Sequence, residues 1–241
     1  IPCAIPQIGA NDGCSITLAW KVGRILASHG INRDTYRCID EYLYDKNRDT
    51  RLRQEYCVSS ATVQNLLADF GRKKLPLTQI PEHYCLHIND THAALMIPEL
   101  LRILLDDYIG RRDGAWDTCW DIVTKLFVYT NHTVLPEALE EWEIDRMNGI
   151  LPRRTMDMIR EIDRRFREQL DAMPIPLPRE AKEKMYIIHS GKVRMANLCI
   201  CAARSVNGVA KLHTQILCKR LLEPFHRCMA DKFCNVTNGI G

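Results

Sequence analysis

Short apolar segments alternate along this chain with helical segments, and two of the short segments run into clusters of polar residues. Residues 84–89 lead into Asn89-Asp90-Thr91-His92, and residues 127–129 lead into Asn131-His132-Thr133. Strands that alternate with helices are typical of an α/β layer with a largely parallel sheet. Ligands of such sheets bind beyond the carboxyl ends of the strands. The sequence therefore predicts a polar binding site where these two strands end.

Helical periodicity predicts the elements that surround this sheet. Apolar residues recur at intervals of three and four over 49–73 and again over 153–172, where Glu161 and Arg165 form an i,i+4 pair on the charged face. Further helices are expected at 97–108 with Pro98 in the first turn, at 115–126, at 136–142 and from 179 onward. A strand at 192–197 is expected to precede a long helical stretch that ends near 222. The first thirty residues are expected to be loop-rich, with a strand at 16–20 and a short helix at 21–28.

Composition excludes several classes of protein. The 241 residues carry 33 Lys and Arg against 30 Asp and Glu, and the net charge of +3 lacks the excess expected of a nucleic-acid binder. The apolar fraction of 46% is typical of a globular chain rather than a disordered one. We find no apolar run of about 20 residues and no secretory leader. The sequence predicts no nucleic-acid partner and no membrane association.

The chain contains 11 cysteines, an odd number, with no CxxC motif. A disulfide framework is expected in shorter secreted chains with an even number of cysteines. Cys57, Cys119 and Cys218 occupy apolar helical positions, and Cys199 and Cys201 lie in an apolar segment. We therefore expect reduced thiols in the protein core and a reducing compartment.

A metal site and a carboxylate pair are two alternatives that the residues leave open. His83, Cys85 and His87 alternate along one side of a predicted strand, but structural zinc sites usually need closer ligand pairs and a second cluster. A half-buried strand is the favoured interpretation, and we expect no metal. A carboxylate pair for glycosidic chemistry would come from Asp90 with Glu137 or Glu140. The chain has no Gly-rich phosphate loop and no nucleophile elbow, so the residues alone name no reaction.

Several motifs are similar to those of one enzyme family and lie in that family's order and at about its spacing. They are Arg51-Leu-Arg-Gln-Glu-Tyr56, Asn89-Asp-Thr-His92 with Ile97-Pro-Glu-Leu100, Tyr129-Thr-Asn-His-Thr-Val-Leu-Pro-Glu-Ala-Leu-Glu140, Leu151-Pro-Arg153, Met195-Ala-Asn-Leu-Cys-Ile200, Val206-Asn-Gly-Val-Ala210 and Thr237-Asn-Gly-Ile240. The chain resembles the α-glucan (glycogen/starch) phosphorylase family over nearly its whole length.

The resemblance implies a cytoplasmic glycosyltransferase that uses pyridoxal 5′-phosphate. The family releases glucose 1-phosphate from the non-reducing end of an α-1,4-glucan by attack of inorganic phosphate, and the complete enzyme is expected to be a homodimer. It also implies a glycosyltransferase-B (GT-B) fold with two domains and the active site between them. Residues 1–241 would form part of the Rossmann-like N-terminal α/β domain, helix-rich with short parallel strands, without a separate second domain.

The resemblance also assigns residues of the sugar site. By motif match, His132 contacts the transferred glucosyl unit through its backbone carbonyl and its ring, and it is the expected catalytic residue. The residues expected to line the pocket beside that sugar are Asp90, His92, Thr133, Ala138 and Glu140. A structural alternative remains for Asp90 and Thr91, each of which could cap the helix that follows.

Departures from the family pattern limit what the chain is expected to do alone. The family's glycine loop would lie upstream of this chain and its cofactor lysine downstream, so no cofactor-binding residue is assigned. The family's gate loop is shortened at Tyr44-Asp45-Lys46-Asn47. Where allosteric vertebrate members carry an Arg-Arg pair that binds the phosphate of AMP, this chain has Ala68-Asp69. The first hypothesis is thus an inactive segment of a phosphorylase, and the alternative is a non-catalytic, glycan-binding relative.

Overall fold

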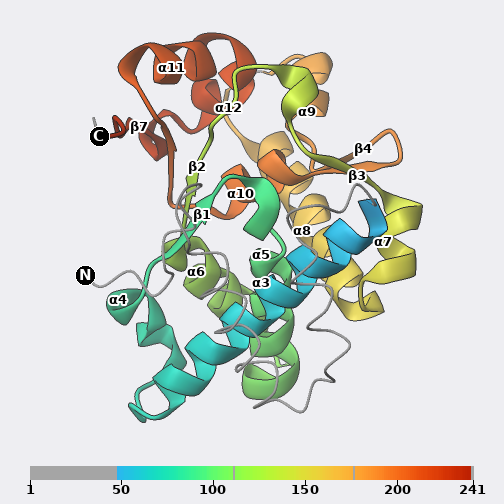
Figure 1. The fold of residues 1–241 in the computed structure, drawn as a ribbon, viewed down its shortest axis with the longest axis vertical. Helices are drawn as coiled ribbons and strands as arrows, with labels where there is room; N and C mark the ends of the chain where they lie inside the picture. The colour runs from blue at the N-terminus through green and yellow to red at the C-terminus, as the bar shows by residue number, and fades with distance from the viewer. Residues whose placement is uncertain (1–47, 111, 176, 240–241) are drawn as a thin grey trace.

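The computed structural model describes residues 48–110, 112–175 and 177–239 (Figure 1). The elements predicted at 16–20 and 21–28 and the Tyr44–Asn47 segment lie outside these residues. None of the described helices is both long and apolar enough to span a membrane.

Within the described residues, four short strands form a parallel sheet in the order β1-β2-β6-β7. They are β1 (Leu86–Asn89), β2 (Phe127–Thr130), β6 (Ser205–Gly208) and β7 (Phe233–Asn235). In the register, Asn89 lies opposite Thr130, which lies opposite Asn207. These three residues, at or next to the ends of their strands, are therefore neighbours at the carboxyl edge of the sheet.

Helices surround this sheet and account for most of the described chain. The α-helices are α3 (Arg48–Gly71), α4 (Ile80–His83), α5 (Met96–Ile103), α6 (Ala115–Leu126), α7 (Ile144–Ile150), α8 (Arg153–Ala172), α9 (Arg179–Met185), α10 (Met195–Ala202), α11 (Lys211–Ile216) and α12 (Glu223–Cys228). The 3₁₀ turns are η1 (Leu77–Gln79), η2 (Thr91–Ala93), η4 (Pro136–Ala138) and η6 (Ala230–Lys232). Two π-helical stretches, η3 (Leu104–Ile109) and η5 (Leu217–Leu221), prolong α5 and α11.

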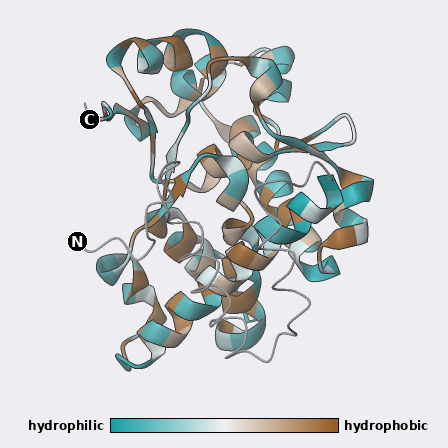
Figure 2. Cartoon of the chain, in the orientation of Figure 1, coloured by the Kyte–Doolittle hydropathy of each residue, from teal (hydrophilic) through white to brown (hydrophobic). Residues whose placement is uncertain are grey.

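The core lies where α5 packs against α3 and α8 and where α10 packs against β2. Hydrophilic and hydrophobic residues alternate around the turns of the surface helices (Figure 2). Burial of their apolar stripes is what holds an amphipathic helix onto a core. All eight residues of α10 are buried, which confirms the prediction that Cys199 and Cys201 pack in the core.

Several predicted boundaries are confirmed. Helix α8 has the predicted bounds, 153–172, and its Glu161–Arg165 ion pair is formed with 2.7 Å between Oε1 and Nε. Helix α6 spans 115–126 as predicted, and α3 begins one residue early and ends at Gly71. Pro98 lies in the first turn of α5, where its missing N–H breaks no hydrogen bond.

Three predicted elements differ from the structure, and a short strand accounts for each difference. Residues 136–142 do not form a helix, because the 3₁₀ turn η4 ends at Ala138 and the chain then enters β3 (Glu141–Glu143). Strand β3 pairs antiparallel with β5 (Lys192–Arg194), which also pairs with β4 (Ile188–His189), so Trp142 and Val193 oppose each other in the core.

The predicted strand at 192–197 and the helix that was expected to run to residue 222 also differ from the structure. Strand β5 ends at Arg194, α10 follows directly, and β6 interrupts the helical stretch at Ser205–Gly208. Strands β5 and β6 have three and four residues, which is too short for an alternating pattern to separate them from the buried helix α10 between them. Gly208, the last residue of β6, allows α11 to pack closely against the strand, since a Cβ atom at this position would lie 2.6 Å from His213 Nδ1.

Candidate functional site

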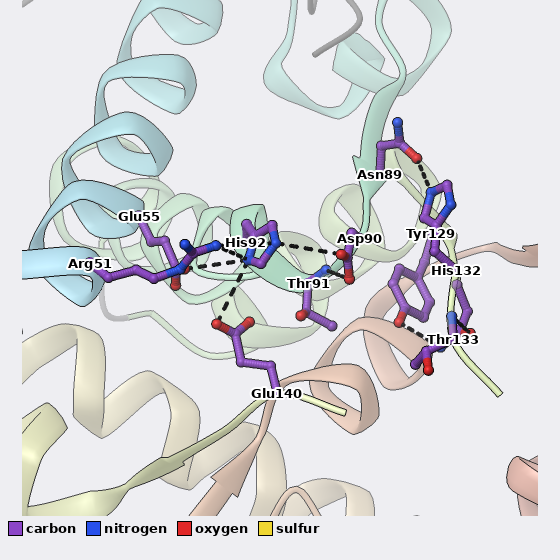
Figure 3. A network of polar contacts seen from close by, with 11 residues as sticks. Arg51, Glu55, Asn89, Asp90, Thr91, His92, Tyr129, His132, Thr133 and Glu140 are labelled. Atoms are coloured by element: carbon purple, nitrogen blue, oxygen red, sulfur yellow. Dashed lines mark hydrogen bonds and ion pairs between the residues drawn. The ribbon is translucent and has the colours of Figure 1, made fainter. Parts of the chain in front are cut away.

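The two polar strand ends meet at the carboxyl edge of the parallel sheet, as the sequence predicted. His132 Nε2 lies 2.5 Å from Asn89 Oδ1, and since an amide oxygen can only accept, the imidazole donates. The Asp90 N–H donates to the Thr130 carbonyl across the same strand pair at 3.1 Å. His132 and Asn89 are both exposed and therefore accessible to a ligand (Figure 3).

Asn131 fixes the loop that carries His132 and Thr133. This residue is buried; its amide donates to the Tyr129 hydroxyl at 3.1 Å, and its side-chain oxygen accepts from the Thr133 N–H at 3.0 Å. Burial raises the pKa of Tyr129 well above its ordinary value, so the phenol stays protonated. The buried Tyr129–Asn131 pair thus holds the backbone on either side of His132.

Asp90 connects strand β1 to the 3₁₀ turn η2 in an unusual backbone conformation. Its φ of 72° and ψ of 168° fall in a region that residues other than glycine rarely adopt. Its carboxylate accepts from the Thr91 N–H at 2.7 Å, so Asp90 caps the 3₁₀ turn η2, whereas Leu95 and not Asp90 or Thr91 is at the N-cap of helix α5. Strain of this kind is found preferentially at functional sites, where the surrounding structure enforces it.

His92 lies at the centre of three carboxylates that come from different parts of the chain (Figure 3). Its ring nitrogens are 3.4 Å from Glu55 Oε1, 3.5 Å from Asp90 Oδ2 and 3.8 Å from Glu140 Oε1. Contact with Glu140 and then with Glu55 raises the pKa of His92 to about 10. The ring is therefore an imidazolium cation at neutral pH.

Glu55 and Glu140 differ in how they are stabilised. Burial raises the pKa of Glu55 to about 7. Burial also acts to raise the pKa of Glu140, but hydrogen bonding to His92 and Thr91 outweighs it and holds that pKa below its usual value. The outer oxygens, Glu55 Oε2 and Glu140 Oε2, are both buried without a hydrogen-bond partner.

Arg51 completes this cluster from the surface of α3. Its Nε lies 3.2 Å from Glu55 Oε1. One of its terminal nitrogens lies 3.3 Å and 3.4 Å from the two ring nitrogens of His92, so the guanidinium lies against the face of the imidazole. Arg51 also borders an open pocket of about 410 Å³, together with Ala138, Glu140 and Trp142.

The chemistry of these residues suits a neutral, hydroxyl-rich ligand. Among the described residues, Glu55, His92 and Glu140 are the one group spaced closely enough to hold a metal ion. The guanidinium of Arg51 lies against two of these three side chains and would repel such an ion. Carboxylates, an imidazole and exposed amides instead offer acceptors and donors for hydroxyl groups.

Two of the three residues considered as metal ligands, Cys85 and His87, contact side chains of other segments. His87 Nε2 lies 2.7 Å from the Thr130 hydroxyl, and Cys85 lies 3.6 Å from a guanidinium nitrogen of Arg204. In the part of the chain that the structure describes, His83, Cys85 and His87 form no metal-binding group.

The structure therefore brings the predicted residues into two adjoining groups. Asp90, His92 and Glu140 form the charged cluster, and His132 and Thr133 lie at the end of β2. Ala138 is exposed on η4 and lines the pocket beside Glu140. Sequence reasoning named Asn89 and Asn131 at the polar strand ends without giving either a role, and it missed the placement of Arg51 and Glu55 in the site. The i,i+4 spacing of Arg51 and Glu55 was the one signal that could have identified this pair.

An α/β protein with polar side chains gathered at the carboxyl edge of a parallel sheet is the class that this fold and site define. Residues 35–241 match the carbohydrate phosphorylase family. The chain is 38% identical to glycogen phosphorylase of Bacillus subtilis over 251 aligned residues, which cover 100% of this chain and 31% of that protein. It is 39% identical to glycogen phosphorylase of Chlamydia trachomatis, with 81% of this chain and 24% of the relative covered.

The human muscle form of glycogen phosphorylase is 37% identical to the chain over 226 residues, 87% of this chain and 26% of the relative. The chain belongs to the carbohydrate phosphorylase family. It spans about a quarter to a third of the length of these relatives.

Proposed function

We propose that this chain is part of the N-terminal domain of an α-1,4-glucan phosphorylase. The complete enzyme would transfer the terminal glucosyl unit of a glycogen- or starch-type glucan to inorganic phosphate and release glucose 1-phosphate. Membership of the family and the small share of each relative that the chain covers support this proposal. A GT-B architecture, a homodimer and a cytoplasmic location follow from the same family resemblance.

The observation that carries the proposal is the convergence of two polar strand ends on one edge of the sheet. His132 and Thr133 would contact the glucosyl unit, and Asp90, His92, Ala138 and Glu140 would line the pocket beside it. The carboxylates accept hydrogen bonds from sugar hydroxyls, and charge-assisted hydrogen bonds of this kind are about twice as strong as neutral ones. Because the His92 imidazolium lies beside it, Glu140 can stay ionised while the pocket binds an uncharged sugar.

The residues described here do not fit the phosphate of pyridoxal 5′-phosphate. The carboxylates of Asp90 and Glu140 oppose a dianion, the cations Arg51 and His92 already face carboxylates, and no lysine is among the described members of the cluster. We propose that the cofactor binds to a part of the enzyme beyond this chain. The chain by itself would then lack phosphorolytic activity.

The test uses the complete polypeptide encoded by the reading frame that contains this chain. With added pyridoxal 5′-phosphate, we expect glucose 1-phosphate to form from glycogen in proportion to inorganic phosphate. His132→Ala should lower kcat/KM at least a hundredfold. Glycan binding without formation of glucose 1-phosphate, in a polypeptide that lacks the glycine loop and the cofactor lysine, would instead identify a non-catalytic member of the family.

A further inference from the structure

Glu55 lies beneath the candidate sugar pocket and contacts two of its side chains. The Glu55 side chain is 1% exposed, and its Oε1 atom is 3.2 Å from Arg51 Nε and 3.4 Å from His92 Nδ1. A buried carboxylate is costly unless charged or polar groups compensate it. Here the compensating groups come from the pocket and not from the core, which ties Glu55 to the pocket.

The His92 imidazole also contacts the other two carboxylates of the site, those of Asp90 and Glu140. Its ring reaches Asp90 Oδ2 at 3.5 Å and Glu140 Oε1 at 3.8 Å. Asp90 and Glu140 approach from the turn after β1 and from the segment before β3, and they are linked through this ring. Glu55 and Glu140 both face Nδ1 of the ring and Asp90 faces Nε2, so a ring held by Glu55 limits where the other two carboxylates can lie.

Helix α3 is a rigid support for such a contact. Its 24 residues pack against α5, α7 and η2, and Glu55 lies in its second turn. Arg51, one turn earlier, presses its guanidinium against the face of the same imidazole. The ring is thus held at its edge by a carboxylate and on its face by a planar cation, both from one helix.

We propose that Glu55 is a positioning residue of the sugar pocket, which fixes the His92 imidazole and thereby holds Asp90 and Glu140 where they accept sugar hydroxyls. This role rests on the proposed function, because that function makes Asp90 and Glu140 sugar-facing. Glu55 itself is too deeply buried to contact the sugar.

A double-mutant cycle in the complete polypeptide tests the proposal. The variants are Glu55→Gln, His92→Gln and the combination, and the measurement is the dissociation constant of glucose by calorimetry. Glu55→Gln should weaken glucose binding at least tenfold in the wild-type background and less than twofold in the His92→Gln background. In assays of glucan synthesis, the Glu55→Gln substitution should raise the KM for glucose 1-phosphate more than it lowers kcat.

Glu99→Gln is the matched control, since Glu99 is an equally buried glutamate of α5 outside the pocket. It should lower the unfolding midpoint without changing glucose affinity. Additive effects of the two pocket substitutions, or unchanged affinity in Glu55→Gln, would overturn the role of Glu55. A wild-type polypeptide that binds glucose but forms no glucose 1-phosphate contradicts the proposed activity alone, and the cycle still decides the role of Glu55.

Discussion

The imidazole of His132 donates to the side-chain oxygen of Asn89, so the ends of strands β1 and β2 are joined by their side chains as well as by the backbone. Parallel pairing places these residues side by side at the carboxyl edge, where the two exposed side chains meet above the sheet. This contact orients the ring that we assign to the glucosyl unit.

Removing the side-chain oxygen of Asn89 should free the His132 ring to leave its present orientation. Asn89→Ala removes one hydrogen bond between exposed side chains, which is expected to change the unfolding free energy by less than about 1 kcal/mol. Glucose affinity of the complete polypeptide should fall about tenfold, the equivalent of about 1.4 kcal/mol. Asn89→Asp keeps an acceptor oxygen and should retain most of the affinity, as measured by calorimetry. Equal losses in the two variants would contradict the orienting role.

Substitutions of Asp90 should affect the stability of the fold and the affinity for glucose differently. Its backbone conformation costs about 1–3 kcal/mol in a residue other than glycine. Asp90→Gly relieves that strain but loses the cap on η2 and the contact with His92, so stability should change little while glucose affinity falls at least tenfold. Asp90→Ala loses the same contacts and keeps the strain, and urea unfolding should find it less stable than the glycine variant. Equal stability of the two variants would exclude strain at this position.

The contribution of His92 to stability should disappear in alkaline solution. Its folded pKa of about 10 exceeds the ordinary value of 6.5, so the folded state binds the proton more tightly than the unfolded state. The stability that this provides is complete below about pH 6.5 and is lost as the pH rises through about 10. The difference in urea midpoint between wild type and His92→Gln should therefore shrink with rising pH. A difference that grows with pH would show that the ring is not held as a cation.

Among the buried charged residues of the helices, Glu99 should be the one whose substitution lowers the unfolding free energy most. It accepts from Ser60 at 2.8 Å, from Tyr56 and Thr155 at 3.1 Å and from Arg102 at 2.9 Å, so it joins α3, α5 and α8. Glu99→Ala leaves these donors unpaired and should lower the unfolding free energy by about 3–5 kcal/mol.

A glutamate of α8 provides the control for this measurement. Glu161 contacts Arg164 and Arg165 at the surface, and Glu161→Ala should cost less than about 1 kcal/mol. Equal losses in the two variants, measured by denaturant unfolding, would mean that burial is not what makes Glu99 important.

AMP should not activate the complete polypeptide. At the position of the family's phosphate-binding arginine pair, Asp69 accepts from Arg72 and from the Tyr84 hydroxyl, and hydrogen bonding to Tyr84 lowers the pKa of Asp69. This carboxylate is ionised at neutral pH and repels a phosphate. Phosphorolysis measured with and without AMP should give equal rates. Activation at micromolar AMP would contradict this interpretation.

Patterns that depend on neighbouring residues were predictable from the sequence. The bounds of α8 and α6 follow from the 3.6-residue period, and the position of Pro98 follows from the chemistry of a helix start. The strands β1 and β2 and their polar ends were recognisable for the same local reason. Strand β6 was not, because its four residues, Ser-Val-Asn-Gly, are too few to show a clear alternating pattern after the buried helix α10.

The sequence by itself determined the α/β class and the family, and its motifs predict which residues face a sugar. Only the tertiary structure decided that Glu55 and Arg51 of α3 belong beside His92, and that residues 141–143 form a strand. These features depend on contacts between segments far apart in the chain. Trp142 is held in an extended strand by pairing with Val193, and the charge of His92 is set by carboxylates that the fold brings together. Local propensity contains neither kind of information.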